Sequence, residues 1–289
     1  MLQDLDFGYL DNQYQAKTPT GKDRVFCMRK GDILIGRDST DQLHVPTWEQ
    51  VSNLCEGWDR WNGTTPTQFV FSMQGEDYYL WMGEAGELEG FAYEAAASLR
   101  QLVSKNICFA AMTAWHLFTW YRNNQFCGRC GSETQHDHKE RMLRCPNCGN
   151  MIFPRISPAV IIALVDGDRL VLSKYAGRNY TRFALLAGFI EIGETAEECV
   201  AREVMEEVGL KVKNIRYYKS QPWGIAGNLQ IGYFCDLDGS DEIHIDENEL
   251  SMAAWYDRHD LPAKDDGISL TREMIRIFGE GKEPAGSAG

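Results

Sequence analysis

Residues 188–210, GFIEIGETAEECVAREVMEEVGL, constrain the fold more than any other stretch of this chain. Within it, Glu203, Glu206 and Glu207 have the spacing that places side chains on one face of a helix. Like charges at this spacing destabilise a bare helix, so the cluster needs a counter-charge. Hard divalent cations such as Mg²⁺ or Mn²⁺ prefer carboxylate oxygens as ligands. The spacing therefore predicts a metal site, with an ordinary solvated helix face as the alternative.

The same stretch predicts how this helix packs and where it ends. Val200, Val204 and Val208 recur every four residues along a neighbouring stripe, which favours burial of that side against a core. Gly209 follows the last apolar residue and suits the left-handed position that closes many helices. We therefore expect an amphipathic helix that ends at Val208.

Charge and length limit the kinds of partner that the chain can have. At 289 residues it is long enough for two modest domains, and its net charge is −13. This excess of acid disfavours nonspecific binding to nucleic acid or anionic membranes, which needs clustered lysine and arginine. An anionic substrate must therefore be met at a local site, with metal ions neutralising its charge.

The first residues do not resemble an export signal. Their sequence, MLQDLDFGYLDNQ, lacks the basic start and apolar centre of a signal peptide. No apolar run in the chain approaches the length of a membrane span. We therefore expect a cytoplasmic protein.

Four of the nine cysteines form two close pairs, Cys127 with Cys130 and Cys145 with Cys148, separated by fourteen residues. Two such pairs bring four thiolates to one point and match a tetrahedral Zn²⁺ site, with unrelated free cysteines as the alternative. Four sulfurs complete the shell, so His136 and His138, which lie between the pairs, are not expected among the ligands. The pattern predicts one structural zinc ion in a module spanning residues 123–155.

The stretches on either side of this module predict two domains of mixed helix and strand. Residues 1–122 alternate strand and turn signals at 24–28, 32–37 and 67–83, followed by helical spacing at Glu87–Leu102 and Phe109–Asn123. We expect a small mixed α/β domain that serves as a scaffold or dimerisation domain. The final residues 281–289 are poor in apolar side chains and are expected to be disordered.

The second domain, residues 156–280, combines apolar strand patterns with two helices. The predicted strands lie at 159–165, 169–175, 183–191, 215–223, 229–237 and 252–258, and a closing helix at 269–278. Strands around the glutamate-bearing helix, closed by a second helix, predict an α/β/α sandwich.

The glutamate-bearing stretch resembles the Nudix box at every defined position. The matching residues are Gly188, Glu194, Arg202, Glu203, Val204, Glu206, Glu207, Gly209 and Leu210. The resemblance implies that residues 156–280 have the Nudix fold. It also implies a hydrolase that cleaves a nucleoside diphosphate linked to another moiety.

Two further features resemble one subfamily, the NADH pyrophosphatases: the four-cysteine module just before the domain, and Ser220-Gln221-Pro222-Trp223 after the box. This resemblance implies hydrolysis of NAD(H) to NMN(H) and AMP, removal of NAD caps from RNA, and a homodimer. The motif departs from the subfamily at Gly224-Ile225-Ala226, where the subfamily has Pro-Phe-Pro. The rigid, aromatic part of the motif is therefore missing.

The resemblance also assigns site residues. Two or three Mg²⁺ or Mn²⁺ ions would be held by the Ala187 carbonyl, Glu203, Glu207 and Glu249, with Glu206 sharing a second ion and completing the catalytic set. Arg202 would pair with glutamates of the box and orient them. The implied substrate contacts are Phe153, Gln221, Pro222, Trp223, Gly224, Ile225, Ala226, Gly227, Asn228, Thr271 and Arg100.

Two other functions stay open at this point. The altered motif is compatible with a Nudix hydrolase acting on ADP-ribose or diadenosine polyphosphates. A zinc-ribbon protein whose Nudix domain only senses a nucleotide is a second alternative, although a pure sensor has no need of all three helix carboxylates.

Overall fold

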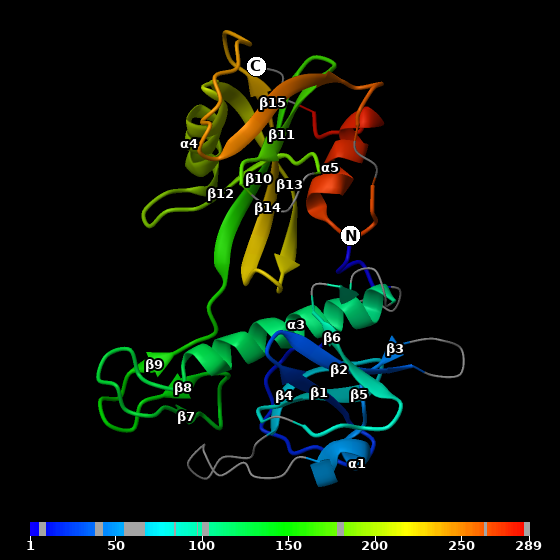
Figure 1. Ribbon diagram of the computed structural model, residues 1–289. Helices are drawn as coiled ribbons and strands as arrows, with labels where there is room; N and C mark the ends of the chain where they lie inside the picture. The colour runs from blue at the N-terminus through cyan, green and yellow to red at the C-terminus, as the bar shows by residue number, and fades with distance from the viewer. Residues whose placement is uncertain are drawn as a thin grey trace. The chain divides into compact units, whose positions relative to one another are not determined.

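The computed structural model describes residues 1–5, 10–37, 43–54, 67–83, 85–96, 98–99, 104–177, 182–262 and 265–285. Contacts between Cα atoms divide the chain into two compact units (Figure 1). Unit 1 comprises Met1, Ile156–Trp223 and Asn228–Gly289, and unit 2 comprises Leu2–Arg155 and Gly224–Gly227. The finer limits at 1–122, 123–155 and 156–280 stay predictions. Within the described ranges, none of the helices combines the length and apolar character needed to cross a bilayer.

Unit 2 is built on a six-stranded sheet in the order β3-β2-β1-β5-β4, with β6 pairing with β2. The strands are β1 (Arg24–Arg29), β2 (Asp32–Arg37), β3 (Leu43–His44), β4 (Thr67–Met73), β5 (Glu76–Trp81) and β6 (Phe91–Ala95). A tight turn with positive φ at Gln74 and Gly75 joins β4 to β5, as antiparallel hairpins require. The predicted strands in this half of the chain are confirmed.

One long helix, α3 (Lys105–Asn123), packs against this sheet. Its buried side chains, among them Ala114, Leu117 and Phe118, share a core with Phe26 of β1 and Leu80 of β5. The short helix α1 (Trp48–Val51) and the 3-10 helix η1 (Ser52–Leu54) follow β3. The helix predicted at Phe109–Asn123 is therefore confirmed, four residues longer at its start.

The helix predicted at Glu87–Leu102 is wrong over residues 87–96, whereas residues 97 and 100–102 lie outside the described part of the chain. Residues 91–95 form β6, which pairs antiparallel with β2. The alanines of this stretch favour a helix, but Phe91 and Tyr93 alternate along the strand and pack against the core of the sheet. Tertiary pairing outweighs local helix propensity here.

The cysteine-rich segment of unit 2 forms a small three-stranded sheet in the order β7-β8-β9. Its strands have two residues each: β7 (Gln135–His136), β8 (Leu143–Arg144) and β9 (Met151–Ile152). Strands this short bury little apolar surface. The module therefore depends on a cross-link for its stability.

Unit 1 is built on a sheet in the order β13-β14-β10-β11-β15, with β12 pairing with β10. The strands are β10 (Ser157–Asp166), β11 (Arg169–Tyr175), β12 (Leu186–Phe189), β13 (Val212–Trp223), β14 (Asn228–Leu237) and β15 (Leu250–Asp257). β10 and β14 run parallel and the other neighbours antiparallel. Each of these strands contains or overlaps a predicted one.

Two helices cover opposite faces of this sheet (Figure 1). Val160 and Ile162 of β10 face α4 (Ala196–Val208), whereas Ile161 and Ala163 face α5 (Leu270–Gly279). Side chains alternate between the two faces of a strand, so both faces of β10 are apolar and both are buried. This is the predicted α/β/α sandwich.

The structure differs from the predicted disordered tail at its start. Glu283 forms an ion pair with Arg258 at 2.6 Å, and the N–H of Gly281 donates to the Phe278 carbonyl at 3.0 Å. Charge pairing therefore holds residues that composition alone marks as unable to fold. Residues 286–289 lie outside the described part of the chain.

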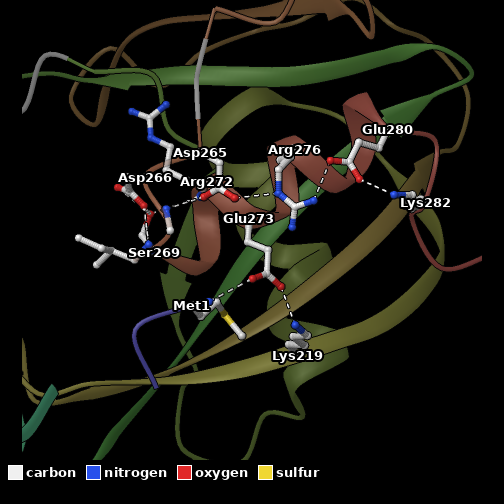
Figure 2. Close-up of polar contacts among 12 residues, drawn as sticks. Met1, Lys219, Asp265, Asp266, Ser269, Arg272, Glu273, Arg276, Glu280 and Lys282 are labelled. Atoms are coloured by element: carbon white, nitrogen blue, oxygen red, sulfur yellow. Dashed lines mark hydrogen bonds and ion pairs between the residues drawn. The ribbon is translucent and has the colours of Figure 1, made fainter. Parts of the chain in front are cut away.

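A buried glutamate joins α5 to β13. Glu273 accepts hydrogen bonds from Lys219 Nζ and Tyr218 Oη, both at 2.7 Å. The amino group of Met1 lies 3.4 Å from the other carboxylate oxygen, and Figure 2 shows the contacts of Glu273 with Met1 and Lys219. Burial raises the pKa of Glu273, but these hydrogen bonds outweigh it and hold the pKa below its ordinary value of 4.5. The ionised carboxylate therefore stabilises the fold above that pH.

Glu273→Gln is expected to lower the free energy of unfolding at pH 7 by roughly 1–3 kcal/mol, because a buried charge-assisted network loses its acceptor. The difference should shrink as the pH falls from 4.5 and vanish below the lowered pKa of Glu273, where the carboxylate of the unchanged folded protein also becomes protonated. Urea unfolding of the variant and the unchanged protein at pH 7 and pH 3.5 measures the difference in free energy of unfolding at each pH. Glu280→Gln is the matched control, since Glu280 lies at the end of the same helix with an exposed ion pair, and it should change little. A difference that is as large at pH 3.5 as at pH 7 would contradict this assignment.

Candidate functional site

The helix that carries the glutamates, α4, begins and ends where its sequence dictates. Thr195 is the N-cap and forms a capping box with Glu198, while Gly209 closes the helix with a left-handed φ of 70°. Val200, Val204 and Val208 are fully buried, as predicted. The orientation of α4 is thus determined by its apolar stripe, which also decides where the glutamates point.

Two of the three helix glutamates are buried. Glu203 is 8% exposed and Glu207 is 2% exposed, whereas the side chain of Glu206 is 57% exposed. Strand β12 approaches the helix at Gly188, where a Cβ atom would lie 1.8 Å from Cδ of Glu203. Only glycine fits at this position while Glu203 keeps its place.

Arg202 holds the carboxylates of the box together. Its guanidinium donates to both oxygens of Glu194, at 2.7 and 2.9 Å, to Glu203 Oε1 at 2.8 Å and to Glu206 Oε2 at 2.9 Å. It also donates to the backbone carbonyl of Phe189 at 3.1 Å, which ties α4 to the end of β12. The prediction that Arg202 pairs with glutamates of the box is confirmed.

The electrostatics of the cluster favour a further cation. The bidentate bond from Arg202 lowers the pKa of Glu194 to about 2. Burial, assisted by the charges of Glu206 and Glu249, raises the pKa of Glu203 in spite of Arg202. One guanidinium therefore leaves the cluster with a surplus of negative charge, and its hard oxygen donors are those that Mg²⁺ or Mn²⁺ prefers.

A loop far along the chain brings Glu249 to this cluster. The N–H groups of His244 and Asp246 donate to the carbonyls of Val208 and Glu207, at 3.0 and 3.1 Å, and so dock the loop on the last turn of α4. Gly209 permits this approach as well as closing the helix, because a Cβ there would lie 3.2 Å from Cβ of His244. These backbone contacts bring Glu249 close enough for its charge to raise the pKa of Glu203.

The cysteines form two knuckles with the same hydrogen-bond pattern. In the first, the N–H of Cys127 donates to the Ser132 carbonyl and the N–H of Gly131 to the Cys127 carbonyl, both at 2.8 Å. The second repeats this with Cys145, Asn150 and Gly149. Gly131 and Gly149 have φ of 75° and 71°, which explains glycine at both turns.

The four sulfurs fit a zinc ion. The Sγ atoms of Cys127, Cys130, Cys145 and Cys148 lie within 4.8 Å of one another, and two of the separations are 3.7 and 3.4 Å. A zinc–sulfur bond of about 2.3 Å places the sulfurs of a tetrahedron about 3.8 Å apart. Hydrogen bonds centred on Ser132 lower the pKa of Cys130 to about 5. Over the described ranges, the glutamates of α4 do not form a second group gathered to that distance.

His136, which lies between the two cysteine pairs, is buried. Its ring packs on Tyr121 with the ring centroids 4.9 Å apart, and burial lowers its pKa to about 4. It therefore serves the core of unit 2, in line with its omission from the predicted zinc shell.

The predicted substrate residues fall on several elements. Gln221, Pro222 and Trp223 end β13, and Asn228 begins β14. The turn Gly224–Gly227 between these strands is closed by a hydrogen bond from the Gly227 N–H to the Gly224 carbonyl, at 3.2 Å, and is grouped with unit 2.

The other predicted contacts lie apart from this hairpin in the sequence. Thr271 is in the first turn of α5. Phe153 follows β9 in unit 2 and is 52% exposed. The predicted contact Arg100 lies outside the described residues.

Family models match both parts of this description. Residues 155–277 match the NUDIX domain, and residues 122–153 match the NADH pyrophosphatase zinc ribbon domain. Among solved structures, a NUDIX hydrolase from Nitrosomonas europaea has a TM-score of 0.47 and 22% identity, covering 54% of this chain and 91% of its own.

Two curated relatives are similar over most of their length. The chain is 36% identical over 198 residues to the NAD-capped RNA hydrolase NudC of Erwinia tasmaniensis, covering 68% of this chain and 76% of the relative. It is also 36% identical over 210 residues to that of Pseudomonas aeruginosa, covering 71% and 74%. The chain belongs to the NudC family of Nudix hydrolases. Membership of the NudC family confirms the predicted fold class, zinc ribbon and enzyme class.

For a NudC-family hydrolase, Gly188→Ala is expected to lower kcat by roughly 100-fold, the cost of an ångström-scale misplacement at an active site. The added methyl group would displace the Glu203 carboxylate, which Gly188 now contacts. Turnover of NADH with Mg²⁺ measures the loss. Gly21→Ala is the control, since a Cβ there meets its nearest neighbour at an ordinary 3.7 Å. Normal kcat in Gly188→Ala would show that Glu203 is not needed where the structure places it.

Proposed function

We propose that this chain hydrolyses the pyrophosphate bond of NAD(H), giving NMN(H) and AMP, and that it also removes NAD caps from RNA. The observation that carries the proposal is the buried pair Glu203 and Glu207, with Glu203 bonded to Arg202, in a chain of the NudC family. The names of the curated relatives support NAD-capped RNA as a substrate. The zinc ribbon of the NADH pyrophosphatase type supports the same substrate class.

The proposed metal site uses Glu203, Glu206, Glu207 and Glu249 with the Ala187 carbonyl. Bound Mg²⁺ or Mn²⁺ ions would neutralise the pyrophosphate and make a water molecule more acidic. The residues of the chain prepare for this: Arg202 orients Glu203 and Glu206, and Gly188 lets β12 approach Glu203. The docked loop before β15 presents Glu249.

The proposed substrate contacts are Trp223, which offers its ring to a base or the nicotinamide, together with Phe153, Thr271, Arg100 and the residues from Pro222 to Asn228. Phe153 offers a stacking ring but no hydrogen-bond donor. We further propose a cytoplasmic homodimer. The N-terminal domain and the zinc ribbon are the parts through which the resemblance implies pairing.

Product analysis by chromatography tests this function. The protein is incubated with Mg²⁺ or Mn²⁺ and equal amounts of NADH, NAD, ADP-ribose, diadenosine polyphosphate and an NAD-capped RNA. AMP and a mononucleotide from NADH or NAD, or RNA with a 5′-monophosphate from the capped RNA, are the expected products. Faster consumption of ADP-ribose would show that Gly224-Ile225-Ala226 redirects specificity. Absence of all products would favour a nucleotide sensor.

A further inference from the structure

The side chain of Gln221 joins two elements of unit 1. It is fully buried, with a relative exposure of 0%. Its Nε2 donates to the Ile268 carbonyl at 2.8 Å, and its Oε1 accepts from the Leu270 N–H at 2.7 Å. Both partners belong to the backbone at the start of α5. Because a buried amide needs partners for both its donor and its acceptor, these two bonds hold the strand end and the helix start in one arrangement.

Gln221 stands between the residues proposed to contact substrate. Residues two apart on a strand share a face, so Gln221 and Trp223 lie on the same face of β13. A register shift between Tyr217 and Ser220 precedes them and re-aims this end of the strand, after which Gln221 pairs with Gln230 and Trp223 with Asn228. On the α5 side of these two hydrogen bonds, Leu270 directly precedes Thr271, which is also a proposed substrate contact.

The same turn has a second, exposed support. Asp266 Oδ1 accepts from the N–H groups of Ile268 and Ser269, at 3.0 and 2.9 Å, and Ser269 is the N-cap of α5. Figure 2 shows Asp266 and Ser269 at this end of the helix. The turn that precedes α5 is therefore held on its exposed side by Asp266 and on its buried side by Gln221.

We propose that Gln221 is a positioning residue for the dinucleotide and not a direct substrate contact. Its amide holds the first turn of α5 against the strand that carries Trp223, so that both sides of the proposed substrate site keep their relative position. The inference rests on the proposed hydrolysis of NAD(H). It departs from the resemblance, which implies substrate contact at Gln221, because the side chain is buried and its amide bonds the backbone of α5.

Steady-state kinetics with NADH test this role. Gln221→Met keeps the size of the side chain but loses both hydrogen bonds, and KM is expected to rise roughly tenfold while kcat stays within about twofold. Asp266→Ala should raise KM roughly threefold, and Asp266→Asn, which keeps an oxygen acceptor, should restore it. In the double variant Gln221→Met with Asp266→Ala, KM should stay close to that of Gln221→Met alone, because both act on one turn.

Direct contact with substrate would instead make the two effects on KM multiply. If the effects of the two variants on KM multiply, or if KM in Gln221→Met equals that of the unchanged protein, the positioning role is overturned while the proposed function stands. Failure of the unchanged protein to cleave NADH would refute the proposed function and this role with it. Gln68→Met, which alters a buried glutamine of unit 2, is the control and should leave KM unchanged.

A second variant keeps the test decisive if Gln221→Met does not fold. Gln221→Glu retains the size of the side chain and the acceptor for the Leu270 N–H but loses the donor to Ile268. It is expected to raise KM with kcat preserved, and an unchanged KM would overturn the role.

Discussion

Glu207→Gln is expected to reduce kcat for NADH hydrolysis by more than roughly 100-fold, because changes to groups that merely support metal ligands already cost 10- to 100-fold. Glu207 is 2% exposed on the inner side of α4, and glutamine has nearly the same size. The folded state should therefore persist, as measured by circular dichroism and thermal unfolding. Nucleotide binding, measured by calorimetry, should also persist.

Glu197→Gln is the matched control for this variant. Glu197 lies on the same helix, where it accepts a hydrogen bond from Tyr233 Oη at 3.0 Å, and it has no place in the proposed metal site. Its kcat should equal that of the unchanged protein. Normal kcat in Glu207→Gln would exclude Glu207 from catalysis, whereas ligand binding without products in the unchanged protein would favour a sensor.

Cys145→Ser is expected to abolish zinc binding and to unfold the ribbon. Apparent binding energies of structural zinc sites reach roughly 10 kcal/mol or more, far beyond what strands of two residues supply. Zinc content by mass spectrometry and hydrogen exchange over residues 123–155 measure the loss. The Mg²⁺ site is made of other residues, so calorimetric binding of Mg²⁺ should be retained.

A cysteine variant is preferable to a chelator here, since a chelator removes both kinds of metal. Cys108→Ala is the control: Cys108 is buried in α3, outside the zinc group, and should keep one zinc per chain. A Cys145→Ser protein that remains folded in the ribbon without zinc would contradict a structural role.

Local sequence predicted the parts of the site whose geometry is local. Helical spacing placed Glu203 and Glu207 on one side of α4, and the valine stripe predicted which side would be buried. The two cysteine pairs likewise predicted the gathering of four sulfurs, because each pair forms a tight knuckle by itself. In these cases every contact that matters lies within a few residues, so spacing carries the information.

Sequence reasoning failed where distant segments compete with local preference. The alanine-rich stretch at Glu87–Leu102 was predicted as helix, yet β6 forms there because the edge of β2 offers a partner. The buried network of Glu273 was also missed, since its signal is no more than a glutamate on an apolar helix. Composition marked the last residues as disordered because it cannot register the ion pair of Glu283 with Arg258.

The amino-acid sequence by itself determined the family, the glutamate helix, the zinc ribbon and the class of reaction, because these follow from residue types at short, regular spacing. Only the tertiary structure decided that Gly188 must leave room for Glu203, which backbone hydrogen bonds dock the loop before β15 on α4, and that the Gln221 amide bonds the start of α5. Each of these depends on two segments that meet only after the sheet has formed. The distances that decide them come from packing and long-range hydrogen bonds, which no local pattern encodes.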